Sequence, residues 1–392
     1  MKISKEVQEL KGIITDYRRN FHQHPEASLK EFRTAERIQG ILTHLGVPFV
    51  KVGETGTFAT IKGKKESGDP TKSIILRADI DALEILEKTG HDYVSKHQGL
   101  MHACGHDAHT SALLGAVHYF NAYPESFSGT IHFAFQQAEE IGAGAKQFVQ
   151  AGLTKGVDQV FGIHVDPTIP LGQVQAAAGP NNASCDIFTI EVHGKSSHVA
   201  RPHEGVDALV IGANIVTKLQ QIASRLTDPL EGVVVGIGKF EAGTRYNIVA
   251  NHAKIEGTLR ALSRENRVRF LKLIEQIAQD EATFLGGTAD FTNYDAANVT
   301  INEESATQRA QKVAEELVGP KNIITQIEPS MGADDFADFL AEIPGCYIRV
   351  GVQSSEDTSF GLHHEQFNLD EAALPLMTQL HVNYAIDFLT NN

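Results

Sequence analysis

The sequence has few cysteines and no long apolar run. Its three cysteines, Cys104, Cys185 and Cys346, lie far apart and are odd in number, so they do not form a disulfide framework. That usage is typical of a reducing cytoplasm, and the charged first residues lack the apolar core of a secretory signal. No apolar stretch approaches the roughly 20 residues that cross a bilayer. We therefore expect a cytoplasmic protein that is not embedded in a membrane.

Basic residues are also scarce relative to acidic ones. The chain has 34 Lys and Arg against 49 Asp and Glu, a net charge of −15. Such a charge disfavours nucleic acid and anionic membrane surfaces as partners. With 392 residues, 42% hydrophobic and 21% charged, the chain is long enough for two or three domains with a sizeable core.

The order of the predicted elements indicates one domain inserted into another. Strands and helices alternate along residues 1–184 and again along 298–392, which is typical of an α/β domain. Residues 185–297 instead follow the order strand, helix, strand, strand, helix, strand, which is the ferredoxin-like pattern. We predict a discontinuous α/β domain with a mixed sheet, interrupted at 185–297 by a ferredoxin-like α+β domain.

Two local patterns add detail to the first domain. The tetrapeptide Ser28-Leu29-Lys30-Glu31 matches a capping box and predicts the start of a helix. The polar segment 63–72, with its glycines, proline and lysines, predicts an exposed loop.

The segment 101–110, MHACGHDAHT, concentrates side chains that bind metals. Cys104 and His106 flank Gly105, which allows the backbone to fold so that its neighbours converge. Thiolate and imidazole suit a borderline metal such as Zn(II), and imidazole also serves Mn, Co or Ni. Taken alone, the motif favours a buried cysteine beside solvent-facing histidines by about two to one, because short motifs often match by chance.

Further polar side chains follow the predicted strands. Asp79, the pair 139–140 and His164 each end a predicted strand, and His363 follows the predicted strand 346–352 by a loop. Ligands of open α/β sheets bind outside the carboxyl ends of the strands. We therefore expect these side chains to meet at one edge of one sheet.

The number of candidate ligands indicates two metal ions. A mononuclear catalytic zinc uses three protein ligands and a water molecule, whereas this chain offers five: Cys104, His106, Glu140, His164 and His363. Two ions polarise a carbonyl and make hydroxide available near neutral pH. Glu139 is then left to take a proton from water and return it to a leaving amine. Read alone, the pair 139–140 also fits an acidic helix N-terminus.

Four motifs together resemble peptidase family M20, in its amidohydrolase branch. They are RADIDAL at 77–83, MHACGHDAHT at 101–110, the glutamate pair at 139–140 and LHHEQF at 362–367. That branch includes N-acyl-amino-acid amidohydrolases, hippurate hydrolases and auxin-conjugate hydrolases. The similarity covers nearly the whole chain, and the motifs occur in the family's order.

The resemblance implies roles for individual residues of the α/β domain. It makes the five candidate ligands the ligands of two divalent ions, with His363 rather than His364 matching the family's Leu-His pattern, and it makes Glu139 the general base and acid. Many members outside this branch have histidine at the position of Asp79, so whether Asp79 is a ligand stays open. Asp81 is expected to orient a ligand from behind it.

The inserted domain carries three further residues implied by the resemblance. The segment 194–202, GKSSHVARP, resembles the part of the family that supplies a histidine to the partner subunit's active site. It implies that His198 stabilises an oxyanion and that the protein is a homodimer or a higher homo-oligomer. Asn247 and Arg260 match residues that hold the substrate carboxylate. Without the resemblance, His198 reads as a surface histidine and Arg260 as part of a surface ion pair.

The sequence thus predicts a metal-dependent amidohydrolase that cleaves the amide bond of N-acyl amino acids or related small amides. It would use two divalent ions, Mn or Zn first and Co or Ni as alternatives, and the inserted domain would act as a lid and dimerisation domain. Three alternatives stay open: a dipeptidase or aminopeptidase on the same scaffold, a non-catalytic protein that binds metal or a small ligand, and a purely structural dimer. The acyl group, the amino acid and the native metal are not fixed by the sequence.

Overall fold

The computed structural model describes residues 1–66 and 71–390, so the middle of the predicted loop 63–72 lies outside the described residues. The chain divides into two compact units. Unit 1 comprises Met1–Gly179, Ile301–Glu328 and Asp335–Asn392, and unit 2 comprises Pro180–Thr300 and Pro329–Asp334. Among the described residues, no helix is both long and apolar enough to cross a membrane.

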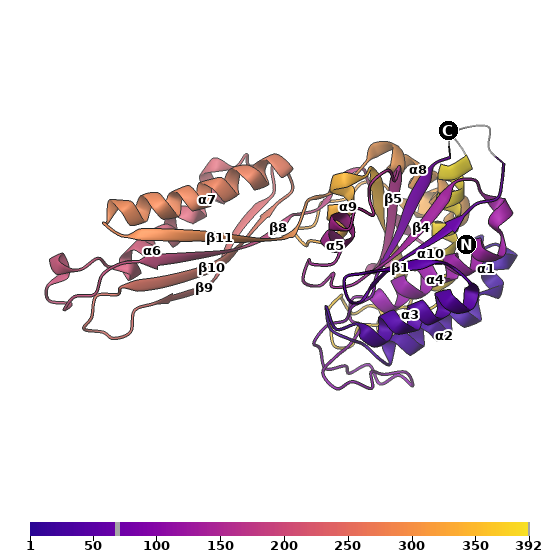
Figure 1. The fold of residues 1–392 in the computed structure, drawn as a ribbon, viewed down its shortest axis with the longest axis horizontal. Helices are drawn as coiled ribbons and strands as arrows, with labels where there is room; N and C mark the ends of the chain where they lie inside the picture. Colours follow the sequence, from indigo (N-terminus) through magenta and orange to yellow (C-terminus); the bar gives the residue numbers. More distant parts are fainter. Residues whose placement is uncertain (67–70, 391–392) are drawn as a thin grey trace. The chain divides into compact units, whose positions relative to one another are not determined.

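Unit 1 is built on an eight-stranded mixed sheet with the order β1-β2-β4-β3-β5-β14-β6-β13 (Figure 1). β3 pairs parallel with β4 and β5, and β14 pairs parallel with β5, whereas β2 pairs antiparallel with β1 and β4, and β14 pairs antiparallel with β6. This confirms the predicted mixed-sheet α/β class. The strands are β1 (Phe49–Val52), β2 (Gly56–Lys62), β3 (Ser73–Asp79), β4 (Thr130–Gln136), β5 (Gln159–Pro170), β6 (Val174–Gln175), β13 (Ile323–Ile324) and β14 (Gly345–Gln353).

Helices pack on both faces of this sheet. The larger core joins one face to α2, α3, α4, α8 and α10, and a smaller core joins the other face to α5 and α9. The strand β3 is buried on both sides because Ile74 and Leu76 face the larger core while Ile75 faces the smaller one. The helices are α1 (Lys5–Glu9), α2 (Lys11–His22), α3 (Phe32–Leu45), α4 (His106–Ala122), α5 (Ala145–Gln150), α8 (Glu304–Val318), α9 (Phe336–Glu342) and α10 (Ala373–Thr390).

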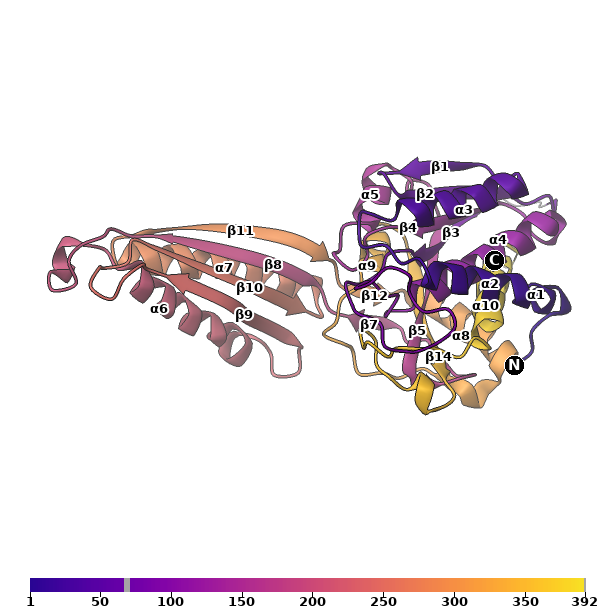
Figure 2. The same ribbon diagram turned by 90° about the horizontal axis from the view of Figure 1, so that it is seen from below.

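Unit 2 contains a four-stranded antiparallel sheet with the order β11-β8-β10-β9, and two helices cover one face of it (Figure 2). With the strands numbered along the unit, this order is 4-1-3-2, so the ferredoxin-like prediction is confirmed. The elements are β8 (Cys185–His193), α6 (Ala208–Gln221), β9 (Val233–Ala242), β10 (His252–Ala261), α7 (Arg264–Phe284) and β11 (Thr288–Ala297). The short strands β7 (Gly179–Asn182) and β12 (Thr300–Asn302), where the chain passes between the units, pair with each other.

The predicted capping box at residues 28–31 is wrong. The helix α3 begins only at Phe32, and its N-cap residue Glu31 makes no side-chain capping hydrogen bond. Ser28 Oγ instead donates to the carboxylate of Asp81 at 2.7 Å, and the buried Glu31 accepts the Ala138 N–H at 2.9 Å. Tertiary partners therefore take both side chains away from the helix, so the local pattern does not determine where the helix starts.

A buried arginine ties α2 to the start of α4. The side chain of Arg18 is fully buried, and its Nε lies 3.2 Å from an oxygen of the equally buried Asp107. A second nitrogen contacts Glu371 Oε1 at 3.0 Å and Tyr93 Oη at 3.1 Å. The positive charge of Arg18 holds the pKa of Asp107 well below its ordinary value, although burial acts in the opposite direction. Both buried charges are therefore compensated inside unit 1.

We predict that Arg18→Met lowers the free energy of unfolding by about 3–5 kcal/mol, because it leaves the buried Asp107 carboxylate without its cation. The matched control is Arg19→Met, since Arg19 contacts the same Glu371 but its side chain is 48% exposed. We expect that variant to lose less than about 1 kcal/mol. Urea denaturation of both variants measures the difference, and equal losses would contradict the importance assigned to the buried pair.

Candidate metal centre

The segment 101–110 forms a tight turn into α4, and this turn places Cys104 beside His106. Gly105 has a φ of +85°, in the left-handed region, and a Cβ atom there would lie 2.4 Å from a methyl carbon of Val165. Glycine is therefore required both by the backbone conformation and by the close approach of β5. The side chains of Cys104 and His106 are buried.

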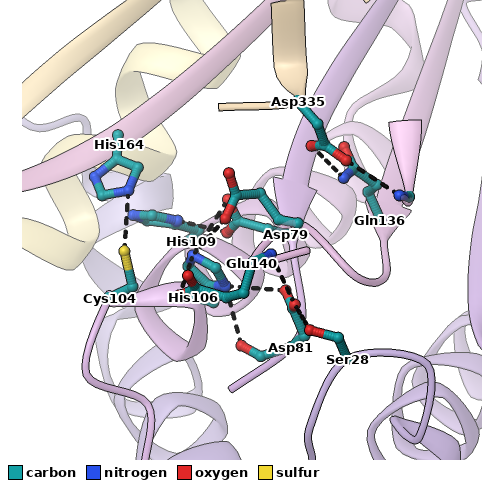
Figure 3. A network of polar contacts seen from close by, with 12 residues as sticks. Ser28, Asp79, Asp81, Cys104, His106, His109, Gln136, Glu140, His164 and Asp335 are labelled. Atoms are coloured by element: carbon teal, nitrogen blue, oxygen red, sulfur yellow. Dashed lines mark hydrogen bonds and ion pairs between the residues drawn. The ribbon is translucent and has the colours of Figure 1, made fainter. Parts of the chain in front are cut away.

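His106 presents one nitrogen without a hydrogen bond. Its Nδ1 lies 3.0 Å from the backbone oxygen of Asp81 and 3.2 Å from Asp81 Oδ1, so this nitrogen donates (Figure 3). Its buried Nε2 has no hydrogen-bond partner among the described residues. Carboxylate oxygens of Asp79, Glu140 and Glu139 lie 3.6, 3.8 and 3.9 Å from it. A ring nitrogen without a hydrogen bond that is surrounded by carboxylates in this way fits a cation site.

The structure places His164 within β5 rather than at the end of a strand, which corrects the sequence prediction. The pairing of β5 with β3 stops at Gly162, but β5 continues alongside β14 to Pro170. His164 Nδ1 donates to the Val165 backbone oxygen at 2.6 Å, and its Nε2 lies 3.5 Å from Cys104 Sγ. This hydrogen bond leaves Nε2 as the nitrogen that faces the thiol.

Glu139 and Glu140 lie in a turn that follows β4, not at the N-terminus of a helix. Both side chains are about 10% exposed. Two contacts fix the turn: Glu31 accepts the Ala138 N–H at 2.9 Å, and Asp81 Oδ2 accepts the Glu140 N–H at 3.1 Å. Asp81 therefore contacts the His106 ring and the Glu140 backbone together.

His363 approaches the same place from a loop that follows β14. Its backbone adopts a φ of +64°, and its N–H donates to the Ala103 oxygen at 2.8 Å. Its Nε2 lies 3.5 Å from Glu140 Oε2. His364 instead stacks on Phe360. The loop thus presents His363 next to the segment that carries Cys104.

The five predicted ligands come together in two groups that share one atom. The ligand atoms of Cys104, His106 and His164 lie within 4.8 Å of one another, and so do those of Cys104, Glu140 and His363. A third group combines His106 with both glutamates, and a fourth combines His106 with Asp79 and His109. Thiolate, imidazole and carboxylate together are a donor set for Zn(II) and for neighbouring divalent transition metals.

Burial and charge shape the ionisation of these groups. Burial raises the pKa of the Cys104 thiol well above its ordinary value. Burial alone would lower the pKa of His106, yet the charge of Asp79 and the hydrogen bond to Asp81 raise it well above the usual range. Burial would raise the pKa of Asp79, but His106, His109 and Arg77 lower it strongly. Each of these pKa shifts arises from burial together with close contacts among the groups of the centre.

Sequence reasoning missed part of the support of this centre. Ser28 and Glu31 were assigned to a capping box, yet they hold Asp81 and the turn before Glu139. Asp335 was also missed as a support: it accepts hydrogen bonds from the N–H groups of Gly144 and Ala145, which follow the glutamate turn. These contacts join residues about 190 positions apart, so no local sequence pattern identifies them.

The residues predicted in the inserted domain lie at two ends of unit 2. The His198 loop pairs with the segment of Asn247, and the Val199 N–H donates to the Asn247 oxygen at 3.2 Å. These two residues lie near the start of β10, which begins at His252. Arg260 lies near the other end of β10, eight residues beyond His252, and the strand between these two residues spans roughly 27 Å. Within one chain, the structure brings His198 and Asn247 together but not Arg260.

Comparisons with known proteins agree with this geometry. Residues 75–387 match the peptidase family M20/M25/M40. The chain is 38% identical to N-acetyl-L-cysteine deacetylase of Bacillus subtilis (strain 168) over 370 residues, which cover 93% of this chain and 85% of that protein. It is 34% identical to thermostable carboxypeptidase 1 of Saccharolobus solfataricus over 391 residues, or 99% and 98% of the two chains.

A solved structure shares both the fold and the sequence. The YXEP protein of Bacillus subtilis, described as a dinuclear metal binding peptidase from the M20 family, superposes with a TM-score of 0.83 at 32% identity. The match covers 98% of this chain and 100% of that one. The resemblance found in the four motifs is confirmed, and this chain belongs to the peptidase family M20/M25/M40.

Proposed function

We propose that this protein is a dinuclear metal-dependent amidohydrolase that cleaves N-acyl amino acids. One observation carries the proposal: Cys104 Sγ belongs to two separate groups of ligand atoms, one with His106 and His164, the other with Glu140 and His363. Cys104 would then help to hold both ions, together with the two pairs of residues around it. The Nε2 of His106 supports the same assignment, because it makes no hydrogen bond with any residue that the structure describes.

Two divalent ions at these residues would polarise the substrate carbonyl and supply hydroxide near neutral pH. The chain's own contribution is the placement of a base. Glu139 is not needed as a ligand, and its Oε2 lies 3.9 Å from His106 Nε2 at the edge of the centre. In the proposed reaction Glu139 accepts the proton of the attacking water and returns it to the leaving amine. Asp81 holds the His106 ring and the backbone of Glu140 in fixed positions relative to each other.

The roles of His198, Asn247 and Arg260 follow from the family resemblance. We propose that Arg260 and Asn247 hold the substrate carboxylate and that His198 stabilises the oxyanion. The location of Arg260 near the opposite end of β10 from the His198 loop supports different roles in two subunits, with His198 and Asn247 serving the site of a second copy. Unit 2 would then act as the lid and dimerisation domain of a homodimer or a higher homo-oligomer.

The metal and the compartment belong to the same proposal. The thiolate fits zinc, while the imidazoles and the carboxylate also accept manganese, cobalt or nickel. All three cysteines are free and buried, which supports a reducing cytoplasm. The second candidate function is peptide cleavage at this same centre, which is favoured by the similarity to thermostable carboxypeptidase 1.

We predict that Glu139→Gln lowers turnover by about 10²–10⁴-fold while both ions stay bound, because only the proton carrier is lost. Metal content and the steady-state rate constant are measured on the same preparation. The matched control is Glu365→Gln. Glu365 lies on the same loop as His363, and its exposed carboxylate contacts Lys88. Unchanged turnover in Glu139→Gln would refute the base, and loss of an ion would make Glu139 a ligand.

We also predict that chelation abolishes activity and that manganese or zinc restores it. After removal of metal, the protein is loaded with Mn, Zn, Co or Ni and assayed on N-acetyl, N-benzoyl and longer N-acyl amino acids alongside free dipeptides. The proposal expects hydrolysis of the acyl amino acids at rates above those of the dipeptides. The reverse preference would establish the peptidase alternative, and full activity without any ion would contradict the proposed chemistry.

A further inference from the structure

Two buried side chains beside the metal centre take no part in the reaction proposed above. The ligand-type atoms of Asp79, His106 and His109 lie within 4.8 Å of one another, so by proximity alone this group could hold an ion itself. Asp79 and His109 are 0% and 1% exposed, and neither can satisfy its polar atoms with bulk water. Their hydrogen bonds decide between a ligand role and a supporting role.

His109 has both of its ring nitrogens occupied. Its Nε2 accepts the Val165 N–H at 3.0 Å, which means that this nitrogen carries no hydrogen. Its Nδ1 therefore carries the hydrogen and donates it to Asp79 Oδ1 at 2.6 Å (Figure 3). An imidazole binds a metal through a nitrogen lone pair, and the lone pair of His109 is already used by the backbone of β5.

Asp79 is held from the other side by an arginine. Its Oδ2 accepts from Arg77 at 2.6 Å, and the same guanidinium also donates to Gln136 at 2.8 Å and to Asp335 at 3.0 Å. Both carboxylate oxygens of Asp79 thus accept strong, charge-assisted or short hydrogen bonds from fixed partners. The Thr110 hydroxyl fixes its backbone by donating to the Asp79 oxygen at 2.8 Å.

These contacts converge on the histidine that faces Cys104. The N–H held by His109 belongs to Val165, and the carbonyl of the same residue accepts from His164 Nδ1 at 2.6 Å. His109 therefore fixes the peptide segment against which the His164 ring is oriented. Asp79 Oδ2 also lies 3.6 Å from His106 Nε2, so its negative charge borders the centre without direct hydrogen bonding to that nitrogen.

We propose that Asp79 and His109 are positioning residues that hold His164 and the charge balance of the metal centre, and that neither ligates an ion. The inference rests on the proposed function, because it assumes that His164 and His106 bind metal. It assigns to Asp79 the role that its position in the sequence left open. It also explains why the ring of His109 joins Asp79, at the end of β3, to the backbone of Val165 in β5.

Three substitutions of His109 separate its two hydrogen bonds. His109→Phe removes both, His109→Gln keeps an acceptor near the Val165 N–H, and His109→Asn keeps a donor near Asp79. The control is His132→Phe on β4, which removes a half-buried imidazole that contacts Thr60 and Phe58, away from the metal centre. The full-length protein is stripped of metal and titrated with Co(II), and affinity, stoichiometry and the cobalt–thiolate absorption band of Cys104 are recorded.

We expect wild type and His132→Phe to bind two Co(II) ions with the same affinity. His109→Phe should still bind two, with the affinity for at least one ion lowered about 10–100-fold, as is usual when a group behind a ligand is lost. His109→Gln should recover more of the affinity than His109→Asn, because it retains the contact to β5. At saturating Co(II) the thiolate band should return in all variants that fold.

Two results would overturn this inference alone. If His109→Phe binds Co(II) as tightly as wild type, His109 does not position His164. If His109→Phe does not fold, the same result for the Gln and Asn variants leads to the same conclusion. If these variants bind one ion fewer at every Co(II) concentration, His109 is a ligand. A wild-type chain that binds fewer than two ions overturns the proposed function itself, and this inference with it, so the two failures are distinguishable.

Discussion

The candidate site depends on where one sulfur atom lies. Cys104 is buried on a turn that only glycine permits at the next position, and two pairs of ligand-type side chains approach it from different elements. Burial raises the pKa of its thiol, so the sulfur is stable as a thiolate only beside positive charge. A metal pair supplies such charge. The surrounding turn, strand and loop bring oxygen and nitrogen atoms close to that sulfur.

Hydrogen bonds donated by backbone N–H groups hold these segments in place. Ala103 accepts the His363 N–H, Asp81 accepts the Glu140 N–H, and Glu31 accepts the Ala138 N–H. Each contact joins two segments that lie far apart in the sequence, and each fixes the backbone of His363, of Glu140 or of the residue before Glu139. The ligands therefore converge before any ion binds, which reduces the conformational entropy that binding would otherwise cost.

Much of this architecture could be predicted from the sequence because the signals were local or periodic. The strand–helix order gave the ferredoxin-like unit, and the ligand types at strand ends indicated one shared edge. The capping-box prediction was wrong because Ser28 and Glu31 make hydrogen bonds with residues far away in the sequence, Asp81 and Ala138. The prediction that His164 ends a strand was wrong because β5 stops pairing with β3 at Gly162 but continues beside β14. Neither the tertiary hydrogen bonds of Ser28 and Glu31 nor the change of neighbour along β5 can be recognised from the local sequence pattern.

The support behind the ligands was the least predictable part. Asp79 and His109 are 30 residues apart and meet only because β3 and α4 pack together, so no spacing rule identifies their hydrogen bond. The tautomer of His109 depends on a backbone N–H of a third element, β5. Such relations exist only in the folded chain, whereas the residues that bear the chemistry itself are recognisable by type and order.

The most direct measurement is a crystal structure of the metal-loaded protein with anomalous diffraction recorded at the absorption edge of the bound metal. The account predicts two peaks in unit 1, with Cys104 Sγ bound to both, His106 and His164 on one and Glu140 and His363 on the other. A single peak, or a peak ligated by Asp79 and His109 in place of Cys104, would contradict it.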